Sequence, residues 1–369
     1  MRVVISGGGT GGHTSAGLAV AAALRGHGIE CAWIGSRTGI EARRVPEAGF
    51  PYHAIPTGKL RRYWDWQNLT DLLLRVPSGV VRARRLLRKL NPNLLFATGG
   101  FVALPTVVAA RGFGIPIVVH EQTSSPGLAN RMAARVAIKI AVTFPQSGTE
   151  FPPDKVVVTG NPLRPELTGG SREAGLARLG LDPALPTIYV TGGAQGSQRI
   201  NRTVGTILEP LLEICQVIHQ CGGKPETGDQ RWLEEQAKGL PRELQSRYHL
   251  IPYVGAELRD VYAVVSLVVG RAGAGTVNEC CHLGLPALYI PLPGTRGDEQ
   301  TANARLVQAV GGAVLFPQVA LVPKGLLESV RGLLADPPRL KAMGERARSL
   351  AVPDAAERIV RLIVEVAAP

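Results

Sequence analysis

The stretch "ISGGGTGGHTSAGLAVAAAL" at residues 5–24 decides the fold class. It begins as an apolar strand, passes through a glycine-rich turn that ends at His13, and continues with the small apolar residues of a helix. Gly7, Gly9 and Gly12 have the G-x-G-x-x-G spacing that places a phosphate at a helix N-terminus in dinucleotide-binding sheets. The stretch therefore predicts a parallel α/β sheet whose first turn holds a phosphorylated ligand.

The same strand–turn–helix pattern recurs along the chain, which predicts a doubly wound sheet. Strand-like apolar runs follow at "ECAWIGS" (30–36), "LLFATGG" (94–100) and "IPIVVHE" (115–121). After the prolines and glycines around residue 161, the pattern starts again with "PTIYVTGGAQGSQRINRTVGTIL" (186–208) and "SLVVGRAGAGTVNECCHLG" (266–284).

We therefore expect two Rossmann-type domains that face each other across a cleft. The first would span residues 1–161 and be completed by a C-terminal helix at about 352–369, and the second would span 162–351. Ligands of such open sheets bind at the carboxyl ends of the strands.

Composition restricts the classes of function. The chain has 369 residues, a formal charge of +12 and five cysteines without metal-ligand spacing. No signal-peptide pattern follows Met1, and no apolar run is long enough to span a membrane, so we expect a cytosolic protein with reduced thiols. The charge indicates an anionic partner, either nucleic acid, membrane headgroups or a phosphorylated ligand. Nucleic acid is disfavoured because aromatic content is 5% and no zinc-finger or RRM signature is present.

A nicotinamide-dependent oxidoreductase is the first alternative. Such an enzyme carries an acid at the end of its second strand to hold the adenosine ribose. The corresponding run here ends in Gly35, Ser36 and Arg37. Arg37 leaves NADP open as a ligand, whereas His13 after the last glycine and the further glycine turns fit that reaction poorly.

Seven motifs together resemble the MurG family of GT-B glycosyltransferases, family 28. They are "GGGTGGH" (7–13), "ATGGF" (97–101), "HEQ" (120–122), "GNPLR" (160–164), "GGAQGSQ" (192–198), "RAGAGTVNE" (271–279) and "DEQTANA" (298–304). The resemblance covers nearly the whole chain and implies an inverting hexosyltransferase. Such an enzyme moves GlcNAc from UDP-GlcNAc to the 4-hydroxyl of the muramyl sugar of lipid I and forms the β-1,4 linkage of lipid II in peptidoglycan synthesis.

The resemblance also implies partners and a location. The partners are UDP-GlcNAc, lipid I, an anionic membrane surface and other proteins of cell-wall synthesis, with no nucleic acid. The location is the cytoplasmic face of the cell membrane, where the protein is peripheral. No D-x-D metal motif is evident, so we expect no metal cofactor.

The resemblance assigns the acceptor diphosphate to the glycine turns of the first domain. Its residues would be Gly11, Gly12, His13, Gly99, Gly100 and Phe101. His13 is our candidate general base, since an imidazole titrates near neutral pH; alternatively it only shapes the turn. Glu121 is a second candidate base or a partner that orients His13, and alternatively a buried structural carboxylate.

The donor would be held by a larger set of residues. These are Thr10, Gly11, Gly12, Thr123, Arg164, Ala194, Gln195, Ser197, Val254, Arg271, Gly273, Ala274, Glu279, Glu299, Gln300 and Asn303. Within this set, the glycine turn at 192–198 and Arg271 would stabilise the departing diphosphate. Arg164 and the Val254 main chain would contact uracil.

Two of the donor assignments have structural alternatives. Glu279 would accept from the ribose hydroxyls, or it closes a capping box with Thr276. Glu299, Gln300 and Asn303 would read the GlcNAc hydroxyls, or they form an exposed helix start that Asp298 caps.

Three positions depart from the family pattern. Phe101, Thr123 and Ala194 stand where the family often has Tyr, Asn and Ser, and each change removes or shortens a polar group. Ser197 is a candidate to supply the hydroxyl that Ala194 lacks. These departures keep a related UDP-sugar transferase with another lipid acceptor, such as diacylglycerol, as an alternative.

Residues 59–90 hold nine cations against two anions. In the first part, Trp64, Trp66, Leu73 and Arg75 belong to a mixture of tryptophan, leucine and cations that favours insertion into an anionic interface. For residues 80–90 we favour a different interpretation, a helix with a core face and a solvated basic back.

Overall fold

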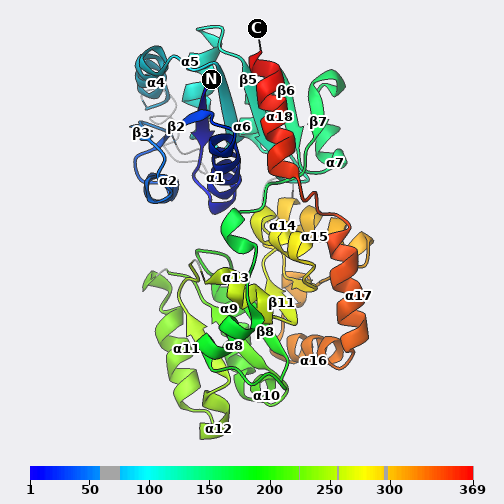
Figure 1. Ribbon diagram of the computed structural model, residues 1–369. Helices are drawn as coiled ribbons and strands as arrows, with labels where there is room; N and C mark the ends of the chain where they lie inside the picture. Colours follow the sequence, from blue (N-terminus) through cyan, green and yellow to red (C-terminus); the bar gives the residue numbers. More distant parts are fainter. Residues whose placement is uncertain (59–74, 224, 256, 295–297, 369) are drawn as a thin grey trace. The chain divides into compact units, whose positions relative to one another are not determined.

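The computed structural model describes residues 1–58, 75–223, 225–255, 257–294 and 298–368. Contacts within the chain divide it into two units (Figure 1). Unit 1 holds residues 1–164 and 352–369, and unit 2 holds residues 165–351. The boundary thus falls after Arg164, three residues beyond the position expected from the sequence, and the chain returns to unit 1 at Val352.

Unit 1 is built on a seven-stranded parallel sheet with the strand order β3-β2-β1-β4-β5-β6-β7. Its strands are β1 (Arg2–Gly7), β2 (Glu30–Ser36), β3 (Tyr52–Ile55), β4 (Leu94–Gly99), β5 (Ile117–Glu121), β6 (Lys139–Val142) and β7 (Val156–Val158). Its described helices are α1 (Gly11–Gly26), α2 (Glu41–Glu47), α4 (Val76–Leu90), α5 (Leu104–Arg111), α6 (Leu128–Ala134), α7 (Pro145–Gly148), the 3₁₀ turn η2 (Pro153–Lys155) and α18 (Ala355–Ala367).

Alternate residues of the strands point to opposite faces of this sheet, and each face carries its own helices. Val4 and Leu95 pack in one cluster with α4, α5 and α6. Val3 and Phe96 pack in the other cluster with α1, α2 and α18. Burial on both faces explains why the strands are continuous apolar runs.

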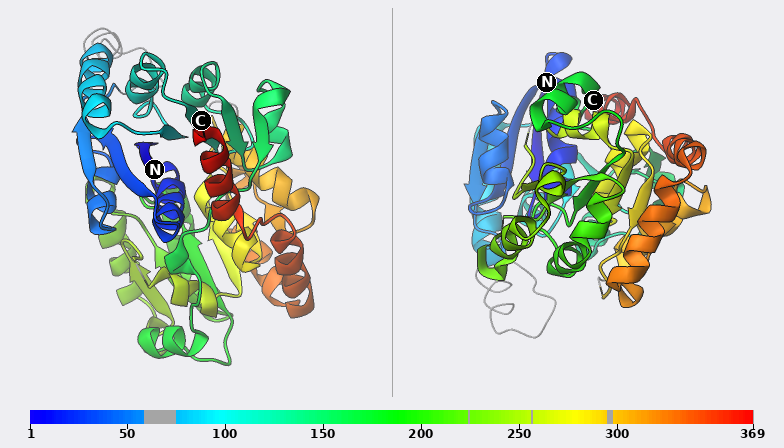
Figure 2. Two further views of the ribbon diagram at one scale, coloured as in Figure 1. Left: turned by 45° about the horizontal axis from the view of Figure 1, so that its top comes forward. Right: turned by 90° about the horizontal axis from the view of Figure 1, so that it is seen from below.

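The C-terminal helix α18 completes unit 1 and lies beside α1 (Figure 1 and the left view of Figure 2). Ile359 and Ile363 are fully buried in the cluster that contains Leu24 of α1. On the surface, His27 after α1 pairs with Glu357 of α18 at 2.8 Å. The amphipathic pattern of "ERIVRLIVEV" therefore produces a helix that covers the sheet of the N-terminal unit.

Unit 2 is built on a six-stranded parallel sheet with the order β10-β9-β8-β11-β12-β13. Its strands are β8 (Thr187–Thr191), β9 (Gln216–Gln220), β10 (Tyr248–Ile251), β11 (Leu267–Gly270), β12 (Ala287–Tyr289) and β13 (Ala313–Leu315). Its described helices are α8 (Arg172–Leu179), α9 (Gln198–Thr206), α10 (Leu208–Leu212), α11 (Asp229–Lys238), α12 (Arg242–Gln245), α13 (Leu258–Val264), α14 (Ala274–Leu283), α15 (Glu299–Ala309), α16 (Pro323–Leu334), α17 (Pro337–Arg348) and the 3₁₀ turns η3 (Pro165–Leu167), η4 (Pro225–Thr227) and η6 (Gln318–Ala320).

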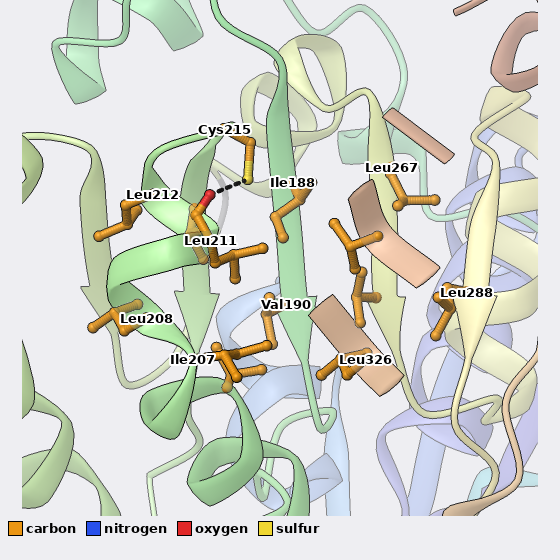
Figure 3. Packing of buried hydrophobic residues seen from close by; sticks show 14 of the residues in the cluster. Ile188, Val190, Ile207, Leu208, Leu211, Leu212, Cys215, Leu267, Leu288 and Leu326 are labelled. Atoms are coloured by element: carbon orange, nitrogen blue, oxygen red, sulfur yellow. Dashed lines mark hydrogen bonds between the residues drawn. The ribbon is translucent and has the colours of Figure 1, made fainter. Parts of the chain in front are cut away.

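A large core cluster of unit 2 lies between one face of its sheet and the helices that cover that face. Figure 3 shows Ile188 and Val190 of β8 among apolar side chains of the neighbouring helices, including Leu211 and Leu326. The Cys215 thiol donates to the Leu211 carbonyl at 3.3 Å and is buried, so it serves as a core residue. The predicted α/β class with two parallel Rossmann-type sheets is confirmed.

A close contact under α1 provides a test of this packing. A Cβ atom at Gly17 would lie 2.4 Å from Cη2 of the buried Trp33, whereas a Cβ at Gly26 of the same helix meets nothing within 4 Å. We expect Gly17→Ala to lower the free energy of unfolding by about 1–3 kcal/mol through overpacking. Gly26→Ala is the matched control and should be neutral or stabilising by about 0.5–1 kcal/mol. Urea unfolding of the two variants checks the difference, and equal stability would contradict it.

Candidate active site

The glycine turns of unit 1 meet at one edge of its sheet. β1, β4 and β5 are consecutive in the sheet, and their carboxyl ends lead into the motifs at 7–13, 97–101 and 120–122. Phe101, half-buried, directly follows the second of these turns. This common edge brings together His13, the Gly99–Gly100 turn and the loop after β5.

His13 lies in the first turn of α1, against the Gly99–Gly100 turn. Thr10 is the N-cap of this helix, and its hydroxyl accepts from the His13 backbone N–H at 3.4 Å. Gly99 and Gly100 have φ angles of 104° and 77°, which favour glycine. A Cβ at Gly99 would lie 2.8 Å from Cε1 of His13. The imidazole therefore occupies space that only a glycine turn leaves open.

The Gln122 side chain contacts the other side of His13. With its oxygen toward the histidine, the Gln122 amide accepts two hydrogen bonds from His13, one from the backbone N–H at 3.3 Å and one from ring Nδ1 at 3.0 Å. Its nitrogen donates to the Gly12 carbonyl at 3.2 Å. This orientation satisfies both ends of the amide. A Cβ at Gly12 would lie 2.9 Å from the amide, so that glycine makes room for it. Gly11 and Gly12 begin the helix and place their backbone at its N-terminus.

The protonation of His13 depends on opposing effects. Burial lowers the pKa of His13 below its usual value. Three interactions raise the pKa of His13 and so offset part of this effect. They are the charge of Glu121, a hydrogen bond to the Thr98 backbone and the charge of Glu41. The imidazole is therefore neutral near pH 7, while the surrounding oxygens stabilise the imidazolium formed when it takes a proton.

Glu121 organises the loop after β5. It is buried, and its carboxylate accepts from Thr123 N at 2.9 Å, Thr123 Oγ1 at 2.7 Å, Gly127 N at 3.1 Å and Asn130 Nδ2 at 2.8 Å. The Thr123 hydroxyl also lies 2.7 Å from the Ser125 carbonyl, so its polar atoms belong to the loop. These contacts favour the structural alternative for Glu121, whose influence on His13 is exerted through its charge.

Sequence reasoning missed Glu41, the first residue of α2. Its side chain is fully buried beneath the first glycine turn. The carboxylate accepts from Gly9 N at 3.1 Å, Ser36 N at 3.2 Å and Ser36 Oγ at 2.5 Å. A Cβ at Gly8 would lie 2.3 Å from its Cδ. Glu41 thus fixes the Gly8–Gly9 backbone, and no spacing in the sequence indicated it.

His120 is a second residue that the sequence did not single out. Its Nε2 lies 3.3 Å from the Gly160 carbonyl, and its Nδ1 has no hydrogen-bond partner in the described part of the chain. Burial lowers the pKa of His120 to about 4. The ring therefore remains neutral. The His120 backbone carbonyl accepts from the Asn130 amide at 3.0 Å. Arg164 is half-buried and ends the first segment of unit 1, before the chain enters unit 2.

In unit 2, Arg271 lies at the carboxyl end of β11, between β8 and β12. Its guanidinium is buried and donates to the Ile290 carbonyl at 2.9 Å, to Ser197 Oγ at 2.8 Å and to Gln318 Oε1 at 2.5 Å. All three acceptors are neutral. Burial lowers the pKa of Arg271 to about 10, so the group is still a cation at neutral pH. Ser197, the N-cap residue of α9, therefore lies beside a buried positive charge.

The glycine turn before α9 packs directly on the strand beside it. A Cβ at Gly196 would lie 1.9 Å from the Cys221 carbonyl oxygen. Gln220, which sequence reasoning missed, donates to Gly193 O at 3.1 Å and accepts from Val254 N at 2.9 Å. Ala194 and Gln195 are exposed on this turn. Because Gln220 takes the Val254 N–H, only the carbonyl of that residue remains for a ligand.

The first residue of helix α14 distinguishes between the two interpretations of Glu279. The helix begins at Ala274 with Gly273 as its N-cap, so Thr276 is not the cap and the capping-box alternative is wrong. Glu279 is half-buried one turn further on, and the Tyr262 hydroxyl donates to its Oε2 at 2.7 Å. The half-buried Gly273 and Ala274 lie at the helix N-terminus, directly after Arg271.

The start of α15 lacks the side-chain cap that the sequence offers as one interpretation. Asp298 is the N-cap, but its side chain makes no capping bond and instead accepts from Thr301 at 2.9 Å. Gln300 Oε1 accepts from Leu292 N at 3.0 Å, and Glu299 is half-buried at the helix start. Asn303 is fully buried and donates to Ala272 O at 3.2 Å. Asn303 therefore supports the turn after β11 from behind, which does not fit a direct sugar contact.

The structure describes only part of the basic segment, residues 59–90. Trp64, Trp66 and Leu73 lie outside the described residues, and Arg75 is exposed just before α4. In α4 the prediction of a core face is right for residues 80, 86, 87 and 90 but wrong for Val81, which is exposed.

Within the residues that the structure describes, no helix has the length and apolar character of a membrane span. The same residues contain no group of three or more His, Cys, Asp and Glu side chains arranged to hold a metal ion.

Two Rossmann-type units in one chain, each with a glycine turn at the carboxyl edge of a parallel sheet, have the architecture of the GT-B fold. The chain belongs to glycosyltransferase family 28. Residues 3–142 match the family's N-terminal domain and residues 187–359 match its C-terminal domain.

Curated relatives support this membership. The chain is 39% identical, over 99% of its length and 98% of the relative, to the UDP-N-acetylglucosamine--N-acetylmuramyl-(pentapeptide) pyrophosphoryl-undecaprenol N-acetylglucosamine transferase of Nocardioides sp.. It is 37% identical, over 99% of both chains, to the protein of that name from Lachnoclostridium phytofermentans. Among solved structures it resembles Acinetobacter baumannii MurG, with a TM-score of 0.73, 27% identity and 99% of both chains covered.

Proposed function

We propose that this glycosyltransferase moves GlcNAc from UDP-GlcNAc to the 4-hydroxyl of the muramyl sugar of lipid I, forming the β-1,4 linkage of lipid II. The observation that carries the proposal is the full-length similarity, at 36–39% identity, to relatives that bear the name of this reaction. The two sheet edges supply groups of the type that the reaction needs.

Unit 2 supplies groups for the donor. Displacement at the anomeric carbon releases UDP, whose diphosphate gains negative charge as the bond to the sugar breaks. The cationic Arg271, with neutral acceptors only, and the N-terminus of α9 are suited to stabilise this charge without a metal. Glu279, held by Tyr262, would accept from the ribose hydroxyls, and Gln300 would contact the sugar.

Unit 1 supplies groups for the acceptor. The N-terminus of α1 at Gly11 and Gly12 would bind the acceptor diphosphate. His13 would take the proton from the attacking 4-hydroxyl as the new bond to the anomeric carbon forms. The resulting imidazolium is stabilised by the charges of Glu121 and Glu41, and UDP leaves with the electrons of the broken bond. A single displacement of this kind inverts the anomeric configuration.

We further propose that unit 1 binds an anionic membrane surface from the cytoplasmic side. Val81 of α4, Val108 of α5 and Phe113 after α5 are exposed apolar residues of these two packed helices. Arg84 and Arg88 of α4 lie over the Phe113 ring at 5.3 and 5.7 Å. The basic back that the sequence predicts for residues 80–90 thus also carries the exposed Val81, and exposed apolar side chains on a helix with arginines suit a headgroup interface.

The first test is ligand-dependent thermal unfolding, followed by a transfer assay. At about a hundred times its Kd, UDP-GlcNAc should stabilise the protein by about 2.7 kcal/mol. UDP-glucose, UDP-GalNAc and NADPH, measured in parallel, should give smaller shifts or none. Radiolabelled GlcNAc should then pass to lipid I and not to diacylglycerol. A shift with NADPH alone, or transfer only to diacylglycerol, would overturn the proposal.

The pH profile tests the role of His13. We expect kcat/KM to fall on the acidic side of the profile as His13 becomes protonated, at a pH below the ordinary pKa of a histidine, because burial lowers the pKa of His13. His13→Gln should lower kcat by about 10²–10⁴-fold and leave the KM for UDP-GlcNAc nearly unchanged.

The acidic limb of the profile should also respond to Glu41. Because its charge raises the pKa of His13, Glu41→Gln should move the limb to lower pH. Glu47→Gln, an exposed residue of the same helix, is the control and should leave the profile unchanged. A native-like profile in the Glu41 variant would argue against His13 as the titrating base.

Vesicle co-sedimentation tests the membrane surface. The protein should bind vesicles that contain anionic lipids more strongly than neutral vesicles, and added salt should weaken the binding. Replacing Val81 and Phe113 together by Ser should reduce binding, whereas Val319→Ser, an exposed residue of unit 2, should not. Equal binding to neutral and anionic vesicles would exclude the electrostatic part of the proposal.

A further inference from the structure

We propose that Gln318 is a positioning residue of the donor site, which holds the Arg271 guanidinium in place and must remain uncharged for the site to bind a diphosphate. The inference rests on the proposed function, because it assigns the donor diphosphate to the edge of the unit 2 sheet. Gln318 opens η6, in the connection between β13 and α16. No motif in the sequence indicated this connection.

The geometry gives Gln318 a defined contact with Arg271. The Arg271 Nη2 atom donates to Gln318 Oε1 and Ser197 Oγ, and Nη1 donates to the Ile290 carbonyl. These three acceptors come from three separate segments, the turn before α9, the end of β12 and η6. Together they engage three of the five N–H groups of the guanidinium, so its plane is fixed while the Nε hydrogen and one Nη1 hydrogen lie outside these bonds.

The charge balance around Arg271 is unusual for a buried cation. Buried guanidinium groups are ordinarily paired with a carboxylate, because isolated charges are costly to bury. Here the amide of Gln318, the hydroxyl of Ser197 and the Ile290 carbonyl carry no charge. Burial also lowers the pKa of Arg271, and the acceptors of its guanidinium in the described part of the chain are all neutral. An anion that arrives at this edge would therefore find an uncompensated positive charge.

The backbone around Gln318 is held by other contacts. Arg199 of α9 donates to the Leu321 carbonyl at 3.1 Å, and Leu321 is fully buried in the core of unit 2. Val319, the next residue after Gln318, is 90% exposed, so the turn itself lies on the surface. A change of the side chain at 318 therefore alters the contact with Arg271 and leaves the fold of the connection supported.

Glutamine meets two requirements at once. Its amide oxygen accepts a strong hydrogen bond from the cation, as a carboxylate would. Unlike a carboxylate, it leaves the positive charge available to a ligand. Glutamate at this position has nearly the same shape and would form an ion pair with Arg271, in competition with the diphosphate.

The test is Gln318→Glu, with readouts that move in opposite directions. Without ligand, its melting temperature should equal or exceed that of the native protein, because the new carboxylate pairs with Arg271. The Kd for UDP and the KM for UDP-GlcNAc should rise about ten- to a hundredfold, and the Kd for uridine, which lacks phosphate, should change less than twofold. Gln318→Ala should raise the KM severalfold, since it frees the guanidinium without neutralising it.

The controls separate the possible failures. Gln236→Glu, an exposed residue of α11, makes the same change in net charge and should leave UDP binding unchanged. Native-like binding of UDP by Gln318→Glu would overturn the inference. A lowered melting temperature with equal loss of UDP and uridine binding would also overturn it, because that pattern reports structural damage. If the native protein binds neither UDP nor UDP-GlcNAc, the proposed function itself fails.

Discussion

The close approach of backbone to backbone at the carboxyl edges of the two sheets is the constraint on which both candidate sites depend. In unit 2, a Cβ at Gly196 would lie 1.9 Å from the Cys221 carbonyl, and one at Gly222 would lie 2.3 Å from Gly196 N. In unit 1, a Cβ at Gly100 would lie 2.4 Å from the Gly8 carbonyl. Only glycine permits these contacts. They draw the helix N-termini toward the sheet edge, where their N–H groups face a ligand.

The strand and turn pattern predicts this architecture well, because glycine turns and apolar strands are local signals. The stretch at residues 5–24 produces β1, the turn and α1 as expected, and "GGAQGSQ" produces the equivalent turn of unit 2. The helix at the C-terminus is also visible in its amphipathic pattern. What the pattern lacks is information on partners far apart in the chain.

The supporting residues illustrate this limit. Glu41, Gln220 and Gln318 each act on a glycine turn or cation that lies 27 to 47 residues away in the sequence. A carboxylate or amide in an ordinary helix or turn carries no local signal of such a contact. A local sequence signal also gives a wrong prediction where a helix begins a few residues away from the expected position. The capping box at Thr276 fails because α14 begins at Ala274, and Asn303 turns inward because it lies on the buried face of α15.

The candidate sites of the two units contain buried charges of opposite sign. In unit 1, Glu41 and Glu121 are carboxylates whose hydrogen-bond partners are backbone N–H groups, hydroxyls and an amide. In unit 2, Arg271 is a cation whose partners are neutral oxygens. Neutral dipoles stabilise each charge but do not cancel it, so its field persists at the nearby sheet edge.

This difference in sign matches the two halves of the proposed reaction. A base that takes a proton becomes positive, and the carboxylates near His13 favour that change. A leaving diphosphate becomes more negative, and the cation beside Ser197 favours that change. In water, solvent dipoles must reorient as charge develops, and this reorientation costs free energy. The groups of the two candidate sites are already oriented by the fold, so the reaction does not incur that cost. Pairing either charge with a counter-ion would make the fold easier to stabilise and would remove the field that the chemistry uses.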